Sequence, residues 1–224
     1  MIKKALVFDS STLINLASNG LLDVLVNLKK IFDGNFYITE SVEYEVVEHP
    51  INIKKFELNA LKLKNLIGDC LTMPEENNEI STLAKEIMES ANHTFKARFK
   101  EKEEYVHLID SGEASCLALS RLLSKKGVKN LIVIDERTTR MLGENPENLR
   151  KLFEKKFHTK VSSSESNYST FKGFSFIRSS ELMYIAYKKG MIELGNNTLD
   201  AVLYATKFHG ASISRSEIET MKKL

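Results

Sequence analysis

The chain has few of the residues that build disulfide frameworks, zinc sites or membrane spans. Its 224 residues include only two cysteines, Cys70 and Cys116, too few for a disulfide scaffold or a cysteine-based zinc site. Both lie among apolar residues, so we expect buried free thiols. No apolar stretch approaches the roughly 20 residues that span a bilayer, and the first apolar run, residues 5–8, is too short for a signal peptide. We therefore expect a cytoplasmic protein without a membrane partner.

Several common catalytic signatures are also missing from the sequence. The five histidines are scattered and show no metal-ligand pairing. There is no glycine-rich phosphate loop and no nucleophile elbow around a serine or cysteine. At 42% hydrophobic and 28% charged residues, the composition is that of an ordinary globular protein.

Charge is distributed unevenly along the chain. Residues 1–120 hold 13 Lys and Arg against 19 Asp and Glu, whereas residues 121–224 hold 19 against 11. This asymmetry is compatible with a polyanionic ligand held by the basic half. Solvated helix faces that happen to differ in charge explain it equally well.

Short apolar stretches alternate with helical patterns. Strands are predicted at residues 5–8, 36–39, 70–73 and 131–135. Helices are predicted over about 12–31 with a break near 19–20, from 41 onward, and over about 53–66, 75–92, 111–126, 144–157, 178–189 and 197–209. Residues 93–105 are predicted to be an exposed helix or a mobile insertion, residues 158–173 a loop, hairpin or partly disordered segment, and the C-terminus a polar tail. The alternation of strands and helices indicates an α/β fold with a mainly parallel sheet.

Two predicted strands end in a carboxylate. Asp9 follows the strand at residues 5–8, and Asp135 ends the strand at 131–135 with Glu136 next to it. In an open α/β sheet, ligands bind outside the carboxyl ends of the strands. We therefore expect Asp9 and Asp135 to face the same ligand site.

Three further acids lie at helix starts. Glu45 is in the helix after the second strand, while Asp110 and Glu113 are three residues apart and share a face of one helical turn. Taken singly, these acids have ordinary structural roles, as N-caps for Asp9 or Asp110 and as a helix-dipole partner for Glu113. Taken together, converging carboxylates repel one another unless a hard cation such as Mg²⁺ or Mn²⁺ binds them. Such an ion assists phosphodiester hydrolysis.

Four segments in this order resemble the motifs of the PIN-domain nucleases: FDSSTLINLAS, SVEYEVV, IDSGEASCLALS and LIVIDERTTR. They are most similar to the prokaryotic branch whose third motif reads Gly-Glu-Ala. The resemblance covers residues 4–142 and resumes weakly at 176–192. It implies a three-layer α/β/α PIN-like fold with a central, mainly parallel sheet, and a metal-dependent ribonuclease that uses Mg²⁺ or Mn²⁺. RNA is the implied partner; a homodimer and an antitoxin-like or other protein are further candidate partners.

The resemblance also assigns roles to individual residues. The catalytic and metal-binding acids are Asp9, Glu45, Glu113 and Asp135, with Glu136 as a rival for the last position and Asp110 as an additional metal ligand. The hydroxyl of Ser11 corresponds to a position that supports the metal site, and Arg140 to an arginine that contacts phosphate or pairs with an acid. We also predict that Ser11, Arg140, Lys151 and Lys155 bind substrate.

The predicted organisation has one core and additions. Residues 1–143 form the nuclease-like core with an insertion at about 90–107. A basic and serine-rich insertion follows at 144–175, then helices at 176–212 that complete the domain, and a tail at 213–224.

Two other functions stay open. The chain could be a catalytically idle PIN-like module that binds RNA or protein through its basic segment. It could also be a haloacid-dehalogenase-like phosphatase, although the second Asp that such enzymes carry after the first is missing in Asp9-Ser10-Ser11-Thr12.

Overall fold

A parallel sheet of four short strands forms the centre of the computed structural model, which describes residues 4–99 and 102–224. The strands, in the order β2-β1-β5-β7, are β1 (Lys4–Phe8), β2 (Asn35–Tyr37), β5 (Lys129–Val133) and β7 (Phe176–Ile177). The predicted strand at 70–73 is present as one parallel bridge from Thr72 to Tyr37 beyond β2, with a 2.7 Å hydrogen bond from Thr72 N to Phe36 O. The expected α/β class with a parallel sheet is thus confirmed.

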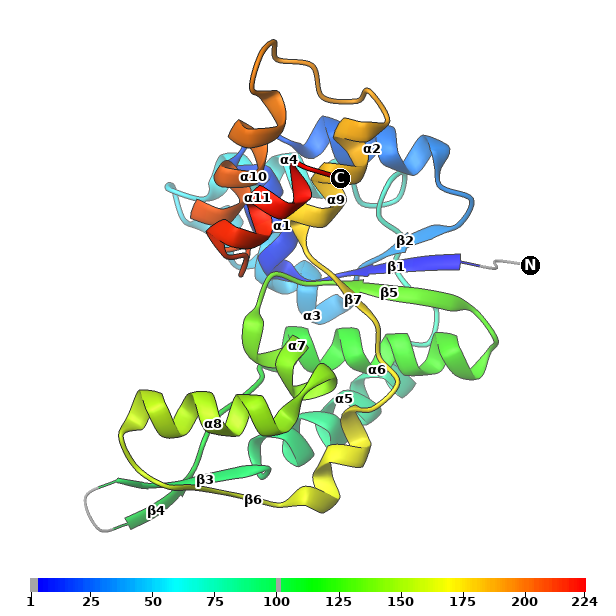
Figure 1. The fold of residues 1–224 in the computed structure, drawn as a ribbon. Helices are drawn as coiled ribbons and strands as arrows, with labels where there is room; N and C mark the ends of the chain where they lie inside the picture. Colours follow the sequence, from blue (N-terminus) through cyan, green and yellow to red (C-terminus); the bar gives the residue numbers. More distant parts are fainter. Residues whose placement is uncertain (1–3, 100–101) are drawn as a thin grey trace.

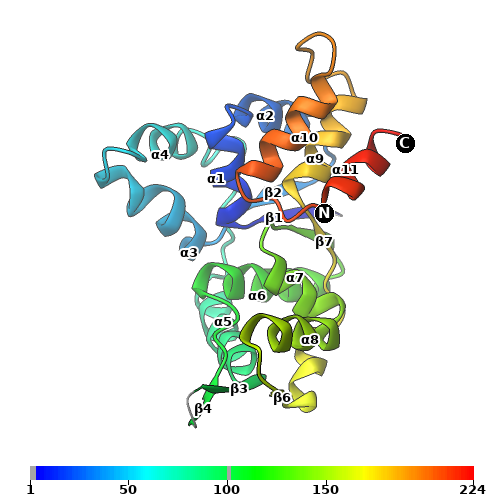
Figure 2. The same cartoon turned by 60° about the vertical axis from the view of Figure 1, so that its left-hand side comes forward.

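Helices cover both faces of this sheet, as Figures 1 and 2 show. On one side lie α1 (Ser10–Ser18), α2 (Leu22–Ile31), α9 (Ser179–Lys188), α10 (Thr198–Phe208) and α11 (Arg215–Met221). On the other side lie α5 (Asn77–Asn92), α6 (Ser111–Lys125), α7 (Arg137–Glu144) and α8 (Pro146–Phe157). The chain after β2 forms α3 (Glu40–Glu43), a π-helical turn (Tyr44–Glu48), a 3₁₀ turn (Pro50–Asn52) and α4 (Glu57–Lys64). In the described ranges, no helix is long and apolar enough to cross a membrane.

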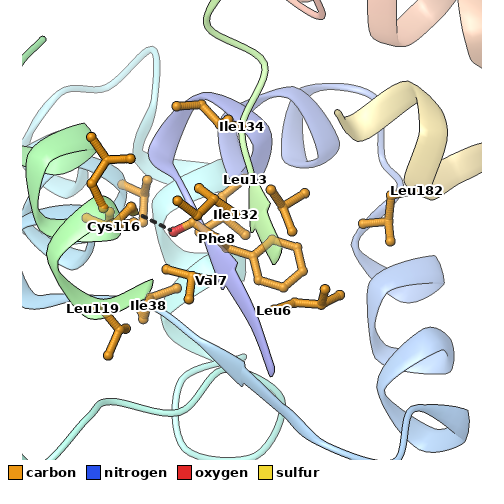
Figure 3. Close-up of a cluster of buried hydrophobic side chains, with 14 of the residues drawn as sticks. Leu6, Val7, Phe8, Leu13, Ile38, Cys116, Leu119, Ile132, Ile134 and Leu182 are labelled. Atoms are coloured by element: carbon orange, nitrogen blue, oxygen red, sulfur yellow. Dashed lines mark hydrogen bonds between the residues drawn. The ribbon is translucent and has the colours of Figure 1, made fainter. Parts of the chain in front are cut away.

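The core is built around β1, whose residues from Ala5 to Phe8 are all buried. An uninterrupted apolar strand of this kind is typical of a parallel sheet covered on both faces. Figure 3 shows Phe8 enclosed by side chains from the neighbouring strands and helices. The buried thiol of Cys116 in α6 donates to Phe8 O at 3.6 Å. This contact holds α6 against the carboxyl end of β1, where Asp9 begins the next helix.

The segment at residues 93–105, predicted to be an exposed helix or a mobile insertion, instead contributes two strands to a small antiparallel sheet. The three strands of this small sheet are β3 (Phe95–Phe99), β4 (Lys102–Tyr105) and β6 (Val161–Ser163), in the order β4-β3-β6. The helical alternative was wrong because every second residue at the start of β3, Phe95 and Ala97, points into the core. The same sheet orders part of the serine-rich segment through β6.

The predicted polar tail contains a packed helix, α11. Ile218 and Met221 of this helix join Leu203, Ala211 and Ile213 in a second small apolar cluster. The tail prediction missed this helix because its two apolar residues are three apart among polar ones, a pattern too short to indicate a helix without its packing partner.

Candidate active site

Asp9 lies at the carboxyl end of β1, is 1% exposed, and caps α1. Its Oδ2 accepts hydrogen bonds from the backbone N of Ser11 at 3.0 Å and from the Ser11 hydroxyl at 2.5 Å. Its Oδ1 is buried and has no hydrogen-bond partner among the described residues. A carboxylate oxygen in this state is costly, and it is available as a ligand.

Glu45 lies in the π-helical turn that follows α3. The backbone N of His49 donates to Tyr44 O at 2.9 Å, which is the i to i+5 bond of such a turn. The turn is held near α6 by a 2.6 Å hydrogen bond between the hydroxyls of Thr39 and Ser115. The half-buried Glu45 carboxylate lies directly against Gly112 at the start of α6, where an added Cβ would be 2.6 Å from Glu45 Oε1.

Glu113 is in the first turn of α6, on the same face as Cys116 and therefore above the end of β1. Its Oε2 accepts from the backbone N of Asp110 at 2.9 Å, and its Oε1 accepts from the hydroxyl of Thr139 in α7. These two donors fix the direction of the carboxylate. Glu113 is thus held between the sheet edge and α7.

These three carboxylates form an electrostatically coupled group. Burial, and to a smaller extent the charge of Glu45, raise the pKa of Asp9 to about 6. Burial, and then the charges of Asp9 and Glu136, raise the pKa of Glu113 to about 7. No Lys or Arg in the described ranges forms an ion pair with Asp9, Glu45 or Glu113. The negative charge of the three carboxylates is therefore not balanced by an ion pair. Their side chains do not converge on one point. In the part of the chain that the structure describes, no three His, Cys, Asp or Glu side chains are arranged to hold a metal ion.

Asp135 ends up in a different environment from the other predicted acids. It is 1% exposed, and its two oxygens accept from Ser179 N and from the Asn15 amide, each at 2.8 Å. Burial raises the pKa of Asp135, and these hydrogen bonds counteract the shift. Its carboxylate joins α1 to the start of α9, and these two hydrogen bonds hold the fold together.

The neighbouring Glu136 is exposed and caps α7 by accepting from Thr138 N at 3.0 Å. Its charge raises the pKa of Glu113, so it is close to the coupled acids. Asp110, predicted as an additional ligand, is exposed and interacts with His107 Nε2 at 2.7 Å instead. Of the two rival residues for the fourth position, Glu136 is the one whose charge is among the main causes that raise the pKa of Glu113.

The predicted substrate-binding residues are dispersed. Ser11 donates to Asp9 and accepts from Asp135 N at 3.2 Å, so it supports the acids. Arg140 is half-buried on α7 and donates to Ser212 O at 3.3 Å. Lys151 and Lys155 lie on the exposed face of α8, next to the small sheet. Only Ser11 and Arg140 are on elements that border the acidic group.

Sequence reasoning missed several residues that position this site. Asn15 is fully buried and donates to both Asp135 and Thr206 O. A lone asparagine on the apolar face of a predicted helix was a usable signal. Gly112 and Thr139 gave no such signal, because their roles depend on side chains far away in the sequence.

Comparisons of the chain with protein-family models, with curated proteins and with solved structures each return no match. The structure establishes a mixed α/β protein with a four-strand parallel sheet, a small antiparallel sheet and a buried acid at the end of β1. What this site does has to be inferred from its own residues and contacts.

Proposed function

We propose that the protein is a metal-dependent ribonuclease with a PIN-like fold. The observation that carries this proposal is the coupled group of Asp9, Glu45 and Glu113 at the carboxyl end of the parallel sheet, together with the unpartnered Oδ1 of Asp9. Carboxylates that are electrostatically coupled without a basic partner destabilise the folded state. Their retention is explained if they bind a cation.

The residues present suit a hard divalent ion. All the available donors are carboxylate oxygens, which Mg²⁺ and Mn²⁺ prefer. Asp9 Oδ1, Glu45 and Glu113 would hold the ion, with Glu136 as a fourth acid at the exposed side.

Each acid is positioned by a distinct neighbour. Ser11 holds Asp9 Oδ2 and so leaves Oδ1 directed away from the cap. Thr139 and the backbone of Asp110 orient Glu113, and the missing side chain of Gly112 leaves room for Glu45. A bound Mg²⁺ or Mn²⁺ would supply the positive charge that stabilises phosphodiester hydrolysis and would lower the pKa of the attacking water.

RNA is favoured as the substrate by the resemblance of the four motifs to PIN-domain nucleases. The excess of Lys and Arg in residues 121–224 supports a polyanionic substrate in general. Among the predicted basic residues, Arg140 lies on α7, and its neighbour Thr139 on the same helix donates a hydrogen bond to Glu113 of the acidic group.

One observation favours the second candidate function, a catalytically idle module that binds RNA or protein. The described acids are not arranged as a ready metal site, and Asp135 is committed to structural hydrogen bonds. Such a module would bind RNA equally well in EDTA and in Mn²⁺, and it would not cleave.

The first test is calorimetric titration of Mn²⁺ into the protein, followed by incubation with a fluorophore-quencher RNA. We expect one Mn²⁺ to bind and the RNA to be cut only when the ion is present. A folded protein that binds no Mn²⁺ and leaves RNA intact would exclude the ribonuclease proposal and leave the binding module.

Replacing Gly112 with alanine tests the position of Glu45. A Cβ at this position would lie 2.6–2.8 Å from both Glu45 carboxylate oxygens, which would have to move. Since these atoms end a flexible side chain and alanine favours the helix by about 1 kcal/mol, we expect unchanged or higher stability. Mn²⁺ affinity should fall about tenfold or more.

Ser111→Ala, at the adjacent exposed position, is the control for helix propensity. Undiminished Mn²⁺ binding by Gly112→Ala would remove Glu45 from the site.

A pair of variants separates Asp135 from Glu136. In the wild type, the two oxygens of Asp135 accept from Ser179 N and from the Asn15 amide. Asparagine at position 135 has only one side-chain oxygen, so one donor loses its acceptor and we expect the free energy of unfolding to fall by about 2 kcal/mol. Glu136→Gln keeps an oxygen that can cap α7 and should change stability by less than about 0.5 kcal/mol, while weakening Mn²⁺ binding. Urea denaturation and calorimetry measure the two effects. An Asp135→Asn protein of normal stability that fails to bind Mn²⁺ would instead make Asp135 the fourth ligand.

A further inference from the structure

A cavity of about 540 Å³ lies between α7, the start of α9 and the loop that joins α10 to α11. Its lining includes four basic side chains and one carboxylate: Arg137, Arg140, Arg178, Lys207 and Glu217. The basic residues come from three separate helical regions of the chain. A concentration of positive charge around a hollow is the electrostatic footprint of an anion site.

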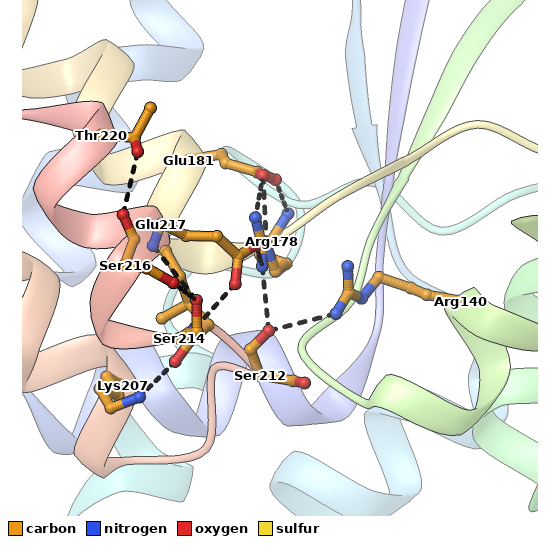
Figure 4. A network of polar contacts seen from close by, with 10 residues as sticks. Arg140, Arg178, Glu181, Lys207, Ser212, Ser214, Ser216, Glu217 and Thr220 are labelled. Atoms are coloured by element: carbon orange, nitrogen blue, oxygen red, sulfur yellow. Dashed lines mark hydrogen bonds and ion pairs between the residues drawn. The ribbon is translucent and has the colours of Figure 1, made fainter. Parts of the chain in front are cut away.

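The basic residues of this cavity differ in how far their charge is balanced. Arg178 is 8% exposed and pairs with Glu181 and, at 2.8 Å, with Glu217, as Figure 4 shows. Within the described ranges, neither Arg137 nor Arg140 forms an ion pair with a carboxylate. The one carboxylate that lines the cavity is thus already paired with Arg178. The charges of Glu144, Glu181 and Asp135 favour the charged form of Arg140, but none of these carboxylates forms an ion pair with it.

Arg140 has unused hydrogen-bonding capacity. Its Nη2 donates to Ser212 O at 3.3 Å, and the same oxygen accepts from Arg178 Nη1 at 2.9 Å. Figure 4 shows both guanidinium groups directed at this oxygen. The Nε of Arg140 is buried and has no acceptor among the described residues. Burial and then the charge of Arg178 lower the pKa of Arg140, and the nearby carboxylates offset this only in part. An anion in the cavity would stabilise the charged guanidinium further. The planar guanidinium fork matches a phosphate group.

The cavity and the acidic group share α7. Thr139 donates to Glu113 in the acidic group, and the next residue, Arg140, lines the cavity. Ser212 N also donates to Asp135 O at 3.3 Å, which joins the cavity wall to the end of β5 and so to Glu136. The cavity and the acidic group are therefore connected through α7 and the end of β5, so one nucleic-acid strand that follows α7 would meet both.

We propose that this cavity binds a backbone phosphate of the RNA strand, adjacent to the phosphate at the acidic group. This inference rests on the proposed ribonuclease function, because one strand occupies both sites. Arg137 and Arg140 contact the phosphate, whereas Arg178 holds the cavity wall through its two ion pairs.

The test is fluorescence anisotropy of a labelled 12-nucleotide RNA in EDTA, so that binding is measured without cleavage. Arg137→Gln and Arg140→Gln are each expected to weaken binding about tenfold and to lower the slope of log affinity against log salt by about one. Lys129→Gln, which removes an exposed charge at the amino end of β5, should change affinity less than about twofold. Arg140→Gln should also keep or raise the melting temperature, because it removes an unpaired half-buried charge.

Two controls identify the source of the anion. Inorganic phosphate that raises the melting temperature of the wild type, with both Gln variants binding RNA normally, would reassign the cavity to a free anion. A poly-glutamate peptide that binds the wild type but not Arg137→Gln, again with normal RNA binding, would reassign it to an acidic protein. Either result overturns the proposal.

The two proposals fail separately in these experiments. If Mn²⁺-dependent cleavage is present and both Gln variants bind and cut RNA as the wild type does, the cavity proposal falls alone. If no cleavage occurs but both variants lose RNA affinity in EDTA, the cavity stands as a phosphate site and the ribonuclease proposal falls.

Discussion

Replacement of Asp9 by asparagine is expected to abolish Mn²⁺ binding and to reduce RNA cleavage at least about a hundredfold. Loss of an outer-shell partner typically costs 10–100-fold in metal affinity or activity, and loss of a ligand should cost no less. Asparagine can still accept the cap hydrogen bond from Ser11 N, because asparagine is as good an N-cap as aspartate. The helix after β1 should therefore form normally.

The stability of this variant is as informative as its activity. At pH 8 and in EDTA, the wild type contains a buried carboxylate whose Oδ1 has no partner, so loss of the charge should leave the melting temperature unchanged or raise it. Asp33→Asn, in the exposed turn before β2, is the matched control and should bind Mn²⁺ and cut RNA normally. A folded Asp9→Asn protein that still binds Mn²⁺ and cleaves would rule out the acidic group as the active site.

Stability should depend on pH in opposite directions with and without metal. The pKa values of Asp9 and Glu113 in the folded protein are about 6 and about 7, above the ordinary values of 3.8 and 4.5 for these side chains. Between those values the folded state binds more protons than the unfolded state, so the free energy of unfolding falls as pH rises. Between pH 5 and pH 8 the two groups together remove roughly 4 kcal/mol in EDTA.

Saturating Mn²⁺ should reverse this dependence. A bound ion competes with protons for the same carboxylates, so stability gained from the ion increases as pH rises. Urea denaturation at pH 5 and pH 8, in EDTA and in Mn²⁺, measures both slopes. The pKa of Glu217 is lowered to about 2, so this group stays ionised throughout the window and adds no slope. Glu113→Gln should remove the larger part of the EDTA slope. An EDTA slope that persists in Glu113→Gln, or that Mn²⁺ does not change, would show that the acids are not coupled to an ion.

Local sequence determined the elements that surround the site. The uninterrupted apolar run before Asp9 is typical of a strand buried on both faces, and it forms β1. Asp9 and the hydroxyl-bearing residues after it suit a helix start, and α1 begins there. The short spacing of Asp110 and Glu113 likewise predicts a helix start, which the structure has at Ser111. These features depend on neighbours within one helical turn or one strand.

Tertiary packing decided which of these residues meet. The sequence could not show that Asp135 is held by buried hydrogen bonds, because its partners Asn15 and Ser179 lie 120 and 44 residues away. It could not show that Gly112 makes room for Glu45, or that the predicted tail packs as α11 and its preceding loop closes a cavity over Arg140. The burial and the hydrogen-bond partners of a side chain depend on elements that are distant in the sequence. Residue types and local spacing do not reveal which of these elements pack together.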